Sequence, residues 1–179
     1  KDLDDWSAVT DHLFIWDYTT QFTNFLTPFP DYRHADQNIR YFSDKGVSGV
    51  FLHGSEENYS DMAEWNSYLH AKLLWDPEID EAAVRADFMT GYYGAAANAV
   101  NNYLDALYEA VGASGATLDI YGNPVNNHSD YLSPERIDRY SSFLDEAEAA
   151  VEEDRVRAAR VARVRLPLEY VVLQQSAFY

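Results

Sequence analysis

Hydrophobic residues in the first third of the chain form two short runs with a helical pattern between them. Residues 12–18 are dense in aromatic and β-branched side chains, and residues 47–52 form a second apolar run, so each run predicts a strand. Residues 36–45 have the spacing of an amphipathic helix, with Asp36 as its N-cap and Gly46 at its end. A strand, a helix and a strand in succession indicate a βαβ unit with parallel strands and a right-handed crossover.

Beyond residue 60 the pattern is helical almost throughout. Helices are predicted to begin near residues 61, 79, 134 and 156, and the stretch 112–131, which contains glycine, asparagine and proline, predicts a loop. Gly91 and Gly94 lie inside the long pattern that starts at residue 79 and indicate a close helix contact or a kink. Pro167 indicates a kink in the last helix.

Two parallel strands do not form a complete α/β domain, because a parallel pair is normally covered on both faces within a larger sheet. We therefore expect an α/β chain, mostly helical, that forms the C-terminal part of a (β/α)8 TIM-like barrel followed by a helical extension. Residues 1–56 would supply the last βαβ portion of the barrel, and residues 57–179 its closing helix and the C-terminal extension. The chain starts without an initiator methionine and inside an amphipathic run, so an upstream part of the same chain is the expected partner.

The charge and the rare residue types exclude several classes of function. Of 179 residues, 30 are acidic and 13 are basic, which gives a net charge of −17 and disfavours nucleic acids and anionic membranes as partners. No segment reaches the roughly 20 apolar residues of a membrane span. Cysteine is absent, the five histidines lack metal-ligand spacing, and no phosphate-binding or dinucleotide motif occurs. We therefore expect neither a metal nor a cofactor.

In a (β/α) barrel the active site lies at the C-terminal ends of the strands. The first predicted strand ends in Trp16, Asp17 and Tyr18, and His53 follows the second. Because side chains alternate along a strand, Trp16 and Tyr18 lie on one face and Asp17 on the other. Aromatic rings stack on the C–H faces of sugars while polar neighbours bind the hydroxyl groups. The loop after the first strand adds the rings of Phe22, Phe25, Phe29 and Tyr32. The candidate substrate-binding residues are Trp16, Tyr18, Phe29 and His53.

Most glycoside hydrolases use a pair of carboxylates as acid and base or nucleophile. Asp17 and Glu56 are carboxylates near the strand ends, and His53 can donate a hydrogen bond or carry a proton, so these three are the candidate catalytic residues. The alternative for the rings is an ordinary hydrophobic core, and the alternative for His53 is a structural hydrogen-bond donor. With 30 acidic residues in the chain, some carboxylates fall near strand ends by chance.

Eight short sequence blocks follow one another along nearly the whole chain. They are residues 15–18 (IWDY), 28–30 (PFP), 38–42 (NIRYF), 46–51 (GVSGVF), 68–77 (YLHAKLLWDP), 91–96 (GYYGAA), 131–135 (YLSPE) and 165–170 (RLPLEY). Together and in this order they resemble the C-terminal half of a bacterial domain-of-unknown-function family. Part of that family is classed as glycoside hydrolase family 163, the endo-β-N-acetylglucosaminidases that act on N-glycans.

The resemblance implies a glycosidase-type barrel whose sugar pocket includes the aromatic residues of the first strand end, and we expect an extracellular or periplasmic location. Members of the family carry Phe-Glu-Gln-Gly where this chain has Phe-Leu-His-Gly at residues 51–54. Leu52 replaces the glutamate, so a carboxylate at this strand end would come from Glu56, from Glu57 or from upstream. This departure bears on catalysis more than on the fold.

Three functions remain open from the sequence. The first is a carbohydrate-active, glycoside hydrolase-like protein of the endo-β-N-acetylglucosaminidase type, to which this chain contributes sugar-pocket residues. The second is a catalytically inactive relative that binds glycans, which the replacement at Leu52 favours. The third is a helical interaction module, which the long amphipathic helices and the acidic surface favour. In the first two the partner is a glycan or oligosaccharide.

Overall fold

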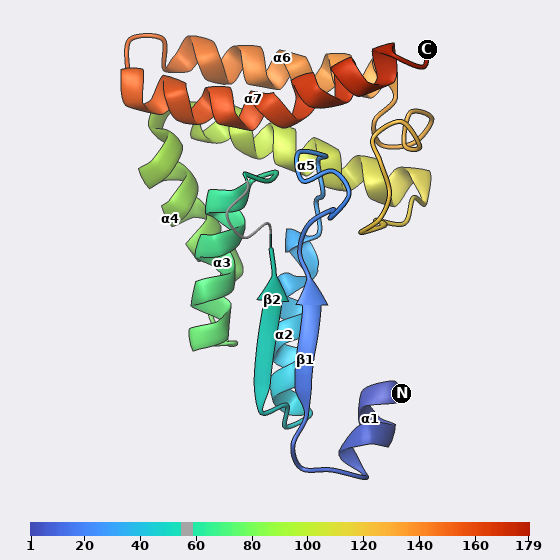
Figure 1. Cartoon of the computed structure of the whole chain (residues 1–179). Coiled ribbons are helices and arrows are strands. Elements are labelled where there is room, and N and C mark those ends of the chain that lie inside the picture. The colour runs from blue at the N-terminus through green and yellow to red at the C-terminus, as the bar shows by residue number, and fades with distance from the viewer. Residues whose placement is uncertain (55–58) are drawn as a thin grey trace.

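Two parallel strands, β1 (Phe14–Tyr18) and β2 (Gly49–His53), form a narrow sheet in the first third of the chain (Figure 1). The computed structural model describes residues 1–54 and 59–179. Helix α2 (Ala35–Asp44) connects the two strands. The predicted strand, helix and parallel strand are therefore confirmed, and each strand begins two residues later than its hydrophobic run suggested.

Helix α2 begins one residue earlier than predicted, because a single 3-10 turn (Tyr32–His34) runs directly into it. His34 is the N-cap residue, so the prediction of Asp36 at that position is wrong. Asp36 lies in the first turn, where the helix dipole and an ion pair with Arg40 at 3.6 Å stabilise its negative charge. The predicted end is confirmed, since Gly46 follows the last turn with a φ of +70° that glycine adopts without strain.

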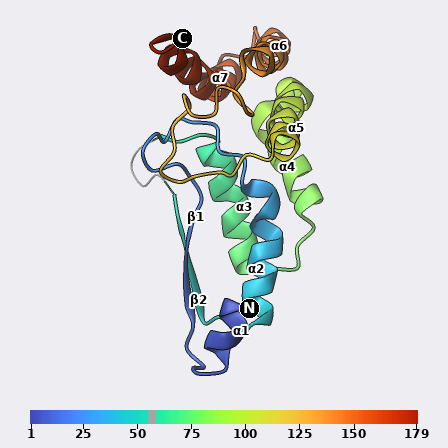
Figure 2. The same ribbon diagram turned by 90° about the vertical axis from the view of Figure 1, so that its right-hand side faces the viewer.

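Helix α3 (Ala63–Trp75) lies beside α2 on the same side of the sheet (Figure 2). Its apolar side buries Trp65, Leu69 and Leu73 completely, as their spacing predicted. The helix ends shortly before Pro77, which disfavours helical geometry in the residue that precedes it. Figure 2 shows that no helix of the described chain covers the opposite side of the strands.

The long helical pattern after residue 79 divides into two helices, α4 (Glu81–Tyr93) and α5 (Ala97–Ser114), joined by a single 3-10 turn (Gly94–Ala96). Gly94 has a φ of +58°, and a Cβ atom at this position would lie 2.3 Å from Nε of Arg157. The predicted interruption is therefore confirmed at Gly94. Gly91 is an ordinary residue of α4, where a Cβ atom would meet nothing within 4 Å.

Helices α5, α6 (Pro134–Ala150) and α7 (Arg155–Ser176) pack into a layer, toward which the C-terminal ends of both strands point (Figure 1). The short helix α1 (Asp2–Ser7) lies near the other end of the strands. Pro167 lies inside α7, which continues as one helix on both sides of it. Large aromatic residues dominate the buried core, among them Tyr32, Trp65, Tyr93, Tyr103, Tyr131 and Tyr140.

The observed class is α/β with helices predominating, as predicted. In residues 1–54 and 59–179 the sheet consists of β1 and β2, and neither outer edge pairs with a further strand. The (β/α)8 barrel and the domain division at residue 56 remain predictions. No helix in the described part of the chain is long and apolar enough to cross a membrane.

Candidate functional site

One face of the sheet is aromatic and open to solvent. It consists of Phe14, Trp16, Tyr18, Phe51 and His53, which we term the aromatic face. Phe14, Trp16 and Phe51 are 75%, 61% and 51% exposed. The register places Trp16 opposite Phe51 and Tyr18 opposite His53, so alternation along the strands brings these side chains to the same side.

His53 lies at the centre of the aromatic face, at the C-terminal end of β2. Its ring centroid is 5.6 Å from that of Trp16 and 5.7 Å from that of Tyr18. The ring of Phe51 lies 5.4 Å away on the same strand. Phe22, from the loop after β1, lies 4.5 Å from His53 and 5.2 Å from Tyr18. The rings therefore form one continuous surface at the end of the strands.

A hydrogen bond fixes the orientation of His53 within this surface. The indole nitrogen Nε1 of Trp16 donates to Nδ1 of His53 over 3.2 Å. Because indole is a donor only, Nδ1 must be the acceptor, and the neutral imidazole then carries its proton on Nε2. The surface thus combines flat apolar rings with the hydroxyl group of Tyr18 and an oriented imidazole, which is a combination suited to a ligand with both C–H faces and hydroxyl groups.

The structure brings together three of the four predicted substrate-binding residues. Trp16, Tyr18 and His53 share the aromatic face. Phe29 does not join them, because it is buried behind the sheet, where its N–H group donates to Oδ2 of Asp61 at 3.0 Å. Glu56, one of the predicted catalytic residues, lies outside the described residues.

Asp17 points away from the aromatic face, as alternation predicts. It lines a cavity of about 300 Å³ behind the sheet, which we term the inner cavity. Oδ1 of Asp17 accepts a hydrogen bond from the N–H group of Tyr18 at 2.9 Å. Residues of the sheet, of α2 and of α3 line the cavity together with Leu118 and Ile120, and its polar lining comprises Asp17, Tyr18, Thr19, Asp31, His34, Asn38 and His70.

Burial shifts the pKa of several groups behind the sheet. It raises the pKa of the Asp31 carboxyl well above its ordinary value, and the negative charges of Asp17 and Asp61 act in the same direction. Burial also raises the pKa of Asp61 to about 7. The imidazole of His70 is affected in the opposite sense, since burial lowers its pKa to about 4. The neutral forms of these three side chains are therefore favoured.

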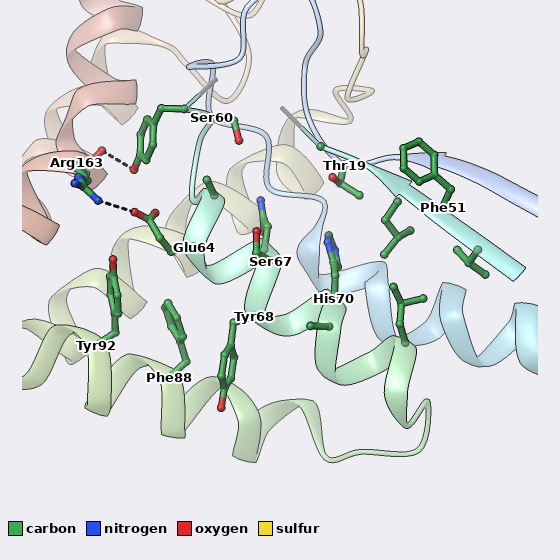
Figure 3. A pocket seen from close by; sticks show the side chains of 18 of the residues that line it. Thr19, Phe51, Ser60, Glu64, Ser67, Tyr68, His70, Phe88, Tyr92 and Arg163 are labelled. Carbon is green, nitrogen blue, oxygen red and sulfur yellow. Dashed lines mark hydrogen bonds and ion pairs between the residues drawn. The ribbon is translucent and has the colours of Figure 1, made fainter. Parts of the chain in front are cut away.

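A larger cleft of about 1350 Å³ lies beside β2, between α3, α4 and α7 (Figure 3). We term it the outer cleft. Figure 3 shows Glu64 and Arg163 at one end of it, where an ion pair of 3.1 Å joins α3 to α7. Thr19, Leu52 and His70 line both the outer cleft and the inner cavity, so the two spaces adjoin at these residues.

Phe14 and Phe51 belong to the aromatic face although their sequence context did not single them out. The signal that identifies Phe51 is the pairing of the two strands, because a residue opposite Trp16 in a parallel register must lie on the same side of the sheet. That register follows from the fold and not from the composition of either strand.

Residues 1–105 match the sequence model of a family described as a domain of unknown function (DUF4838). The match covers more than half of the chain and includes both strands and helices α2, α3 and α4. The whole aromatic face therefore lies within the matched part. No curated protein and no solved structure matches the chain.

Proposed function

The chain belongs to the family of domains of unknown function DUF4838, and we propose that it is a glycan-binding segment of a glycoside hydrolase-like protein. The observation that carries the proposal is the group of solvent-exposed rings around His53, at the C-terminal ends of two parallel strands. In (β/α) barrels this end of the strands holds the active site.

A saccharide suits the aromatic face better than other ligands that stack on rings. Contiguous exposed apolar surface is unfavourable in water and usually marks a binding site. Single-stranded nucleic acids also stack on aromatic rings, but a chain with a net charge of −17 repels their phosphates. An uncharged glycan can cover the ring of Trp16 with a C–H face while its hydroxyl groups bond to Tyr18.

We also propose that β1 and β2 are the last two strands of a (β/α)8 barrel. Two observations support this: the helices α2 and α3 cover one face of the strand pair, and the other face presents rings. In a barrel that second face would point to the interior, and Trp16, Tyr18 and His53, which lie nearest the C-terminal ends of the strands, would line the mouth where a glycan binds. Residues 1–56 would then belong to the barrel, and the upstream part of the chain would supply the remaining strands.

The resemblance to glycoside hydrolase family 163 makes N-glycans the proposed substrates and endo-β-N-acetylglucosaminidase activity the proposed reaction. In the described residues Asp17 lies on the side of the sheet opposite to Trp16. A general acid that acts on a sugar stacked on the aromatic face would therefore come from Glu56, from Glu57 or from upstream. The described part of the chain contributes binding and orientation of the substrate.

The placement of Asp17 also favours a second form of the proposal, in which the protein binds glycans without hydrolysing them. The carboxylate of Asp17 lines the inner cavity, and Leu52, its partner in the register, has an apolar side chain. Neither residue therefore brings a carboxylate to the rings. The two forms share the aromatic face and differ only in turnover. One set of measurements on the full-length protein distinguishes them.

Binding is measured by isothermal titration calorimetry with a complex N-glycan and with tri-N-acetylchitotriose. We expect Trp16→Ala to weaken binding at least tenfold, which corresponds to about 1.4 kcal/mol. Trp75→Ala is the matched control, because Trp75 is 91% exposed at the end of α3, far along the chain from the aromatic face. Equal loss in both variants, or no binding of either sugar by the folded protein, contradicts the proposal.

Turnover is measured on the same N-glycan by the release of oligosaccharide. If the wild-type protein releases oligosaccharide and the Trp16→Ala variant releases less, the result supports the hydrolase. Binding without release supports the inactive glycan-binding relative.

A helical interaction module is the remaining candidate, and the outer surface of α7 favours it. Leu166, Val172 and Leu173 are exposed there, and the last two help to line a small apolar hollow. A monodisperse monomer that captures no partner protein would argue against this function, and it leaves the glycan proposal intact.

A further inference from the structure

The inner cavity contains hydrogen-bond acceptors without a matching cation. Asp17 from β1 and Asp31 from the loop before α2 both line it. Oδ1 of Asp31 is buried and has no hydrogen-bond partner, and neither carboxylate forms an ion pair, within the described residues. The nearby Arg33 pairs instead with Asp105. A buried carboxyl oxygen without a donor is destabilising, so the lining of the cavity is chemically incomplete at Oδ1 of Asp31.

His70 is a second, independent acceptor in the same place. It is 8% exposed, and it forms no hydrogen bond with any residue in the described ranges. Figure 3 shows its ring projecting from α3 on the side of Thr19, where the inner cavity adjoins the outer cleft. Because burial lowers its pKa to about 4, the imidazole is neutral near pH 7 and keeps one nitrogen with a lone pair.

The rest of the cavity wall is mainly apolar. Its volume of about 300 Å³ is at the lower end of the range for small-molecule sites. A ligand that satisfies both parts of the lining has a positively charged donor group and a short hydrocarbon stem. The apolar lining consists of Phe29, Ala35, Ile39, Leu52, Leu118 and Ile120.

We propose that the inner cavity binds a small organic ammonium ion, which donates hydrogen bonds to acceptors of the polar lining, Oδ1 of Asp31 among them, and whose stem contacts the apolar wall. A primary ammonium group has three donors and one positive charge, so it can satisfy the unpaired Oδ1 of Asp31 together with a second acceptor of the lining. The ligand enters from the outer cleft, because Thr19, Leu52 and His70 line both spaces.

Two other ligand classes fit the cavity less well. The described residues contain no group of three or more histidine and carboxylate side chains that could hold a metal ion. An uncharged polyol would place several of its hydroxyl groups against the apolar wall, where they find no hydrogen-bond partner. Asp17 lies on the opposite side of the sheet from Trp16, and Tyr18 is the residue of the aromatic face that also lines the inner cavity.

The test uses n-butylammonium chloride and n-butanol, which share a four-carbon stem and differ in charge. The full chain is titrated with each by calorimetry at constant ionic strength, because a net charge of −17 attracts any cation to the surface. We expect saturable binding of one n-butylammonium ion per chain and at least tenfold weaker binding of n-butanol.

Variants locate the binding within the chain. Asp31→Asn and Asp17→Asn are each expected to weaken n-butylammonium binding at least tenfold. Asp138→Asn is the matched control, since it makes the same change at an exposed position of α6. Circular dichroism checks the fold, and His70→Gln replaces any variant that does not fold. Trp16→Ala is expected to leave ammonium binding unchanged, so failure of this site is distinguishable from failure of the glycan site.

Three results would overturn the proposal: binding that does not saturate, equal affinity for n-butanol, or unchanged affinity in the folded Asp17 and Asp31 variants.

Discussion

Trp16 and His53 are joined across the two strands by a hydrogen bond of 3.2 Å, from the indole Nε1 to the imidazole Nδ1. They are not direct partners in the register, because Trp16 lies opposite Phe51 and His53 opposite Tyr18. The bond is therefore a diagonal contact, of the kind that long aromatic side chains make on one face of a sheet. It holds the largest exposed ring of the aromatic face against the only imidazole there.

This contact predicts the tautomer of His53 and the environment of the Trp16 indole. We expect the nitrogen chemical shifts of the neutral His53 ring to show a proton on Nε2 and none on Nδ1. His53→Ala removes the acceptor and should move the indole N–H resonance of Trp16. The resonance of Trp75, which is 91% exposed, is an internal control that should stay in place. A proton on Nδ1 of the neutral ring would contradict the structure.

Asp61 makes the stability of the protein depend on pH. Its pKa is raised from 3.8 to about 7 by burial, so the folded protein keeps a proton that the unfolded chain loses. The contribution of protonated Asp61 to the free energy of unfolding is complete below about pH 4 and is lost as the pH rises through about 7. At about 1.4 kcal/mol per pKa unit, the difference of about 3 corresponds to about 4 kcal/mol.

Asp61→Asn should therefore raise the free energy of unfolding at pH 7.5 relative to pH 4, compared with the wild type. The amide oxygen still accepts the hydrogen bond from the N–H group of Phe29, so the substitution changes charge more than contacts. Denaturant unfolding at the two pH values measures the effect. Asp138→Asn, at an exposed position of α6, should keep the wild-type dependence of the free energy of unfolding on pH. If Asp61→Asn has the same pH dependence as the wild type, Asp61 does not have the raised pKa.

His70 acts in the opposite direction over nearly the same pH range. Burial lowers its pKa from 6.5 to about 4, so the unfolded chain takes up a proton first on acidification. The contribution of neutral His70 to the free energy of unfolding, about 3 kcal/mol, is present above about pH 6.5 and is lost as the pH falls toward about 4. His70→Gln should remove this loss, and the comparison of unfolding curves at pH 4 and pH 7 measures it. His128→Gln, at a less buried histidine of the loop before α6, is the control.

Because the effects of Asp61 and His70 have opposite signs, they partly cancel in the wild-type protein. Each single variant should therefore show a steeper net pH dependence than the wild type, in opposite directions. The double variant should lie closer to the wild type than either single variant does. Equal slopes in all four proteins would show that neither group is buried as described.

The two strands and their parallel orientation were predictable because their signals are local. Dense runs of aromatic and β-branched residues mark β1 and β2, and one intervening helix is enough to make the strands parallel. Alternation then placed Trp16 and Tyr18 together and Asp17 on the other side. The break at Gly94 was also local, since glycine adopts the required φ of +58°.

Features that depend on distant contacts were not predictable. Phe29, which lies between two prolines in a loop, was predicted to bind the substrate, but Asp61 anchors its backbone and the fold buries its side chain. The inner cavity draws Asp31 from a loop, Asn38 from α2 and His70 from α3. No spacing along the sequence connects these residues, and only the packing of the helices behind the sheet brings them together.

Gly94 and Gly91 provide a matched pair of substitutions only three residues apart. At Gly94 the φ of +58° strains any residue with a Cβ atom, and that atom would lie 2.3 Å from Nε of Arg157. We expect Gly94→Ala to reduce the free energy of unfolding by about 1–3 kcal/mol.

Gly91 has helical geometry within α4, and a Cβ atom there meets nothing within 4 Å. Gly91→Ala should therefore stabilise the protein by about 0.5–1 kcal/mol, because alanine loses less backbone entropy than glycine on folding. If α4 ends before Gly94, denaturant unfolding should give changes of opposite sign in the free energy of unfolding for the two variants. If both substitutions are stabilising, residues 81–114 form one continuous helix and the break between α4 and α5 is wrong.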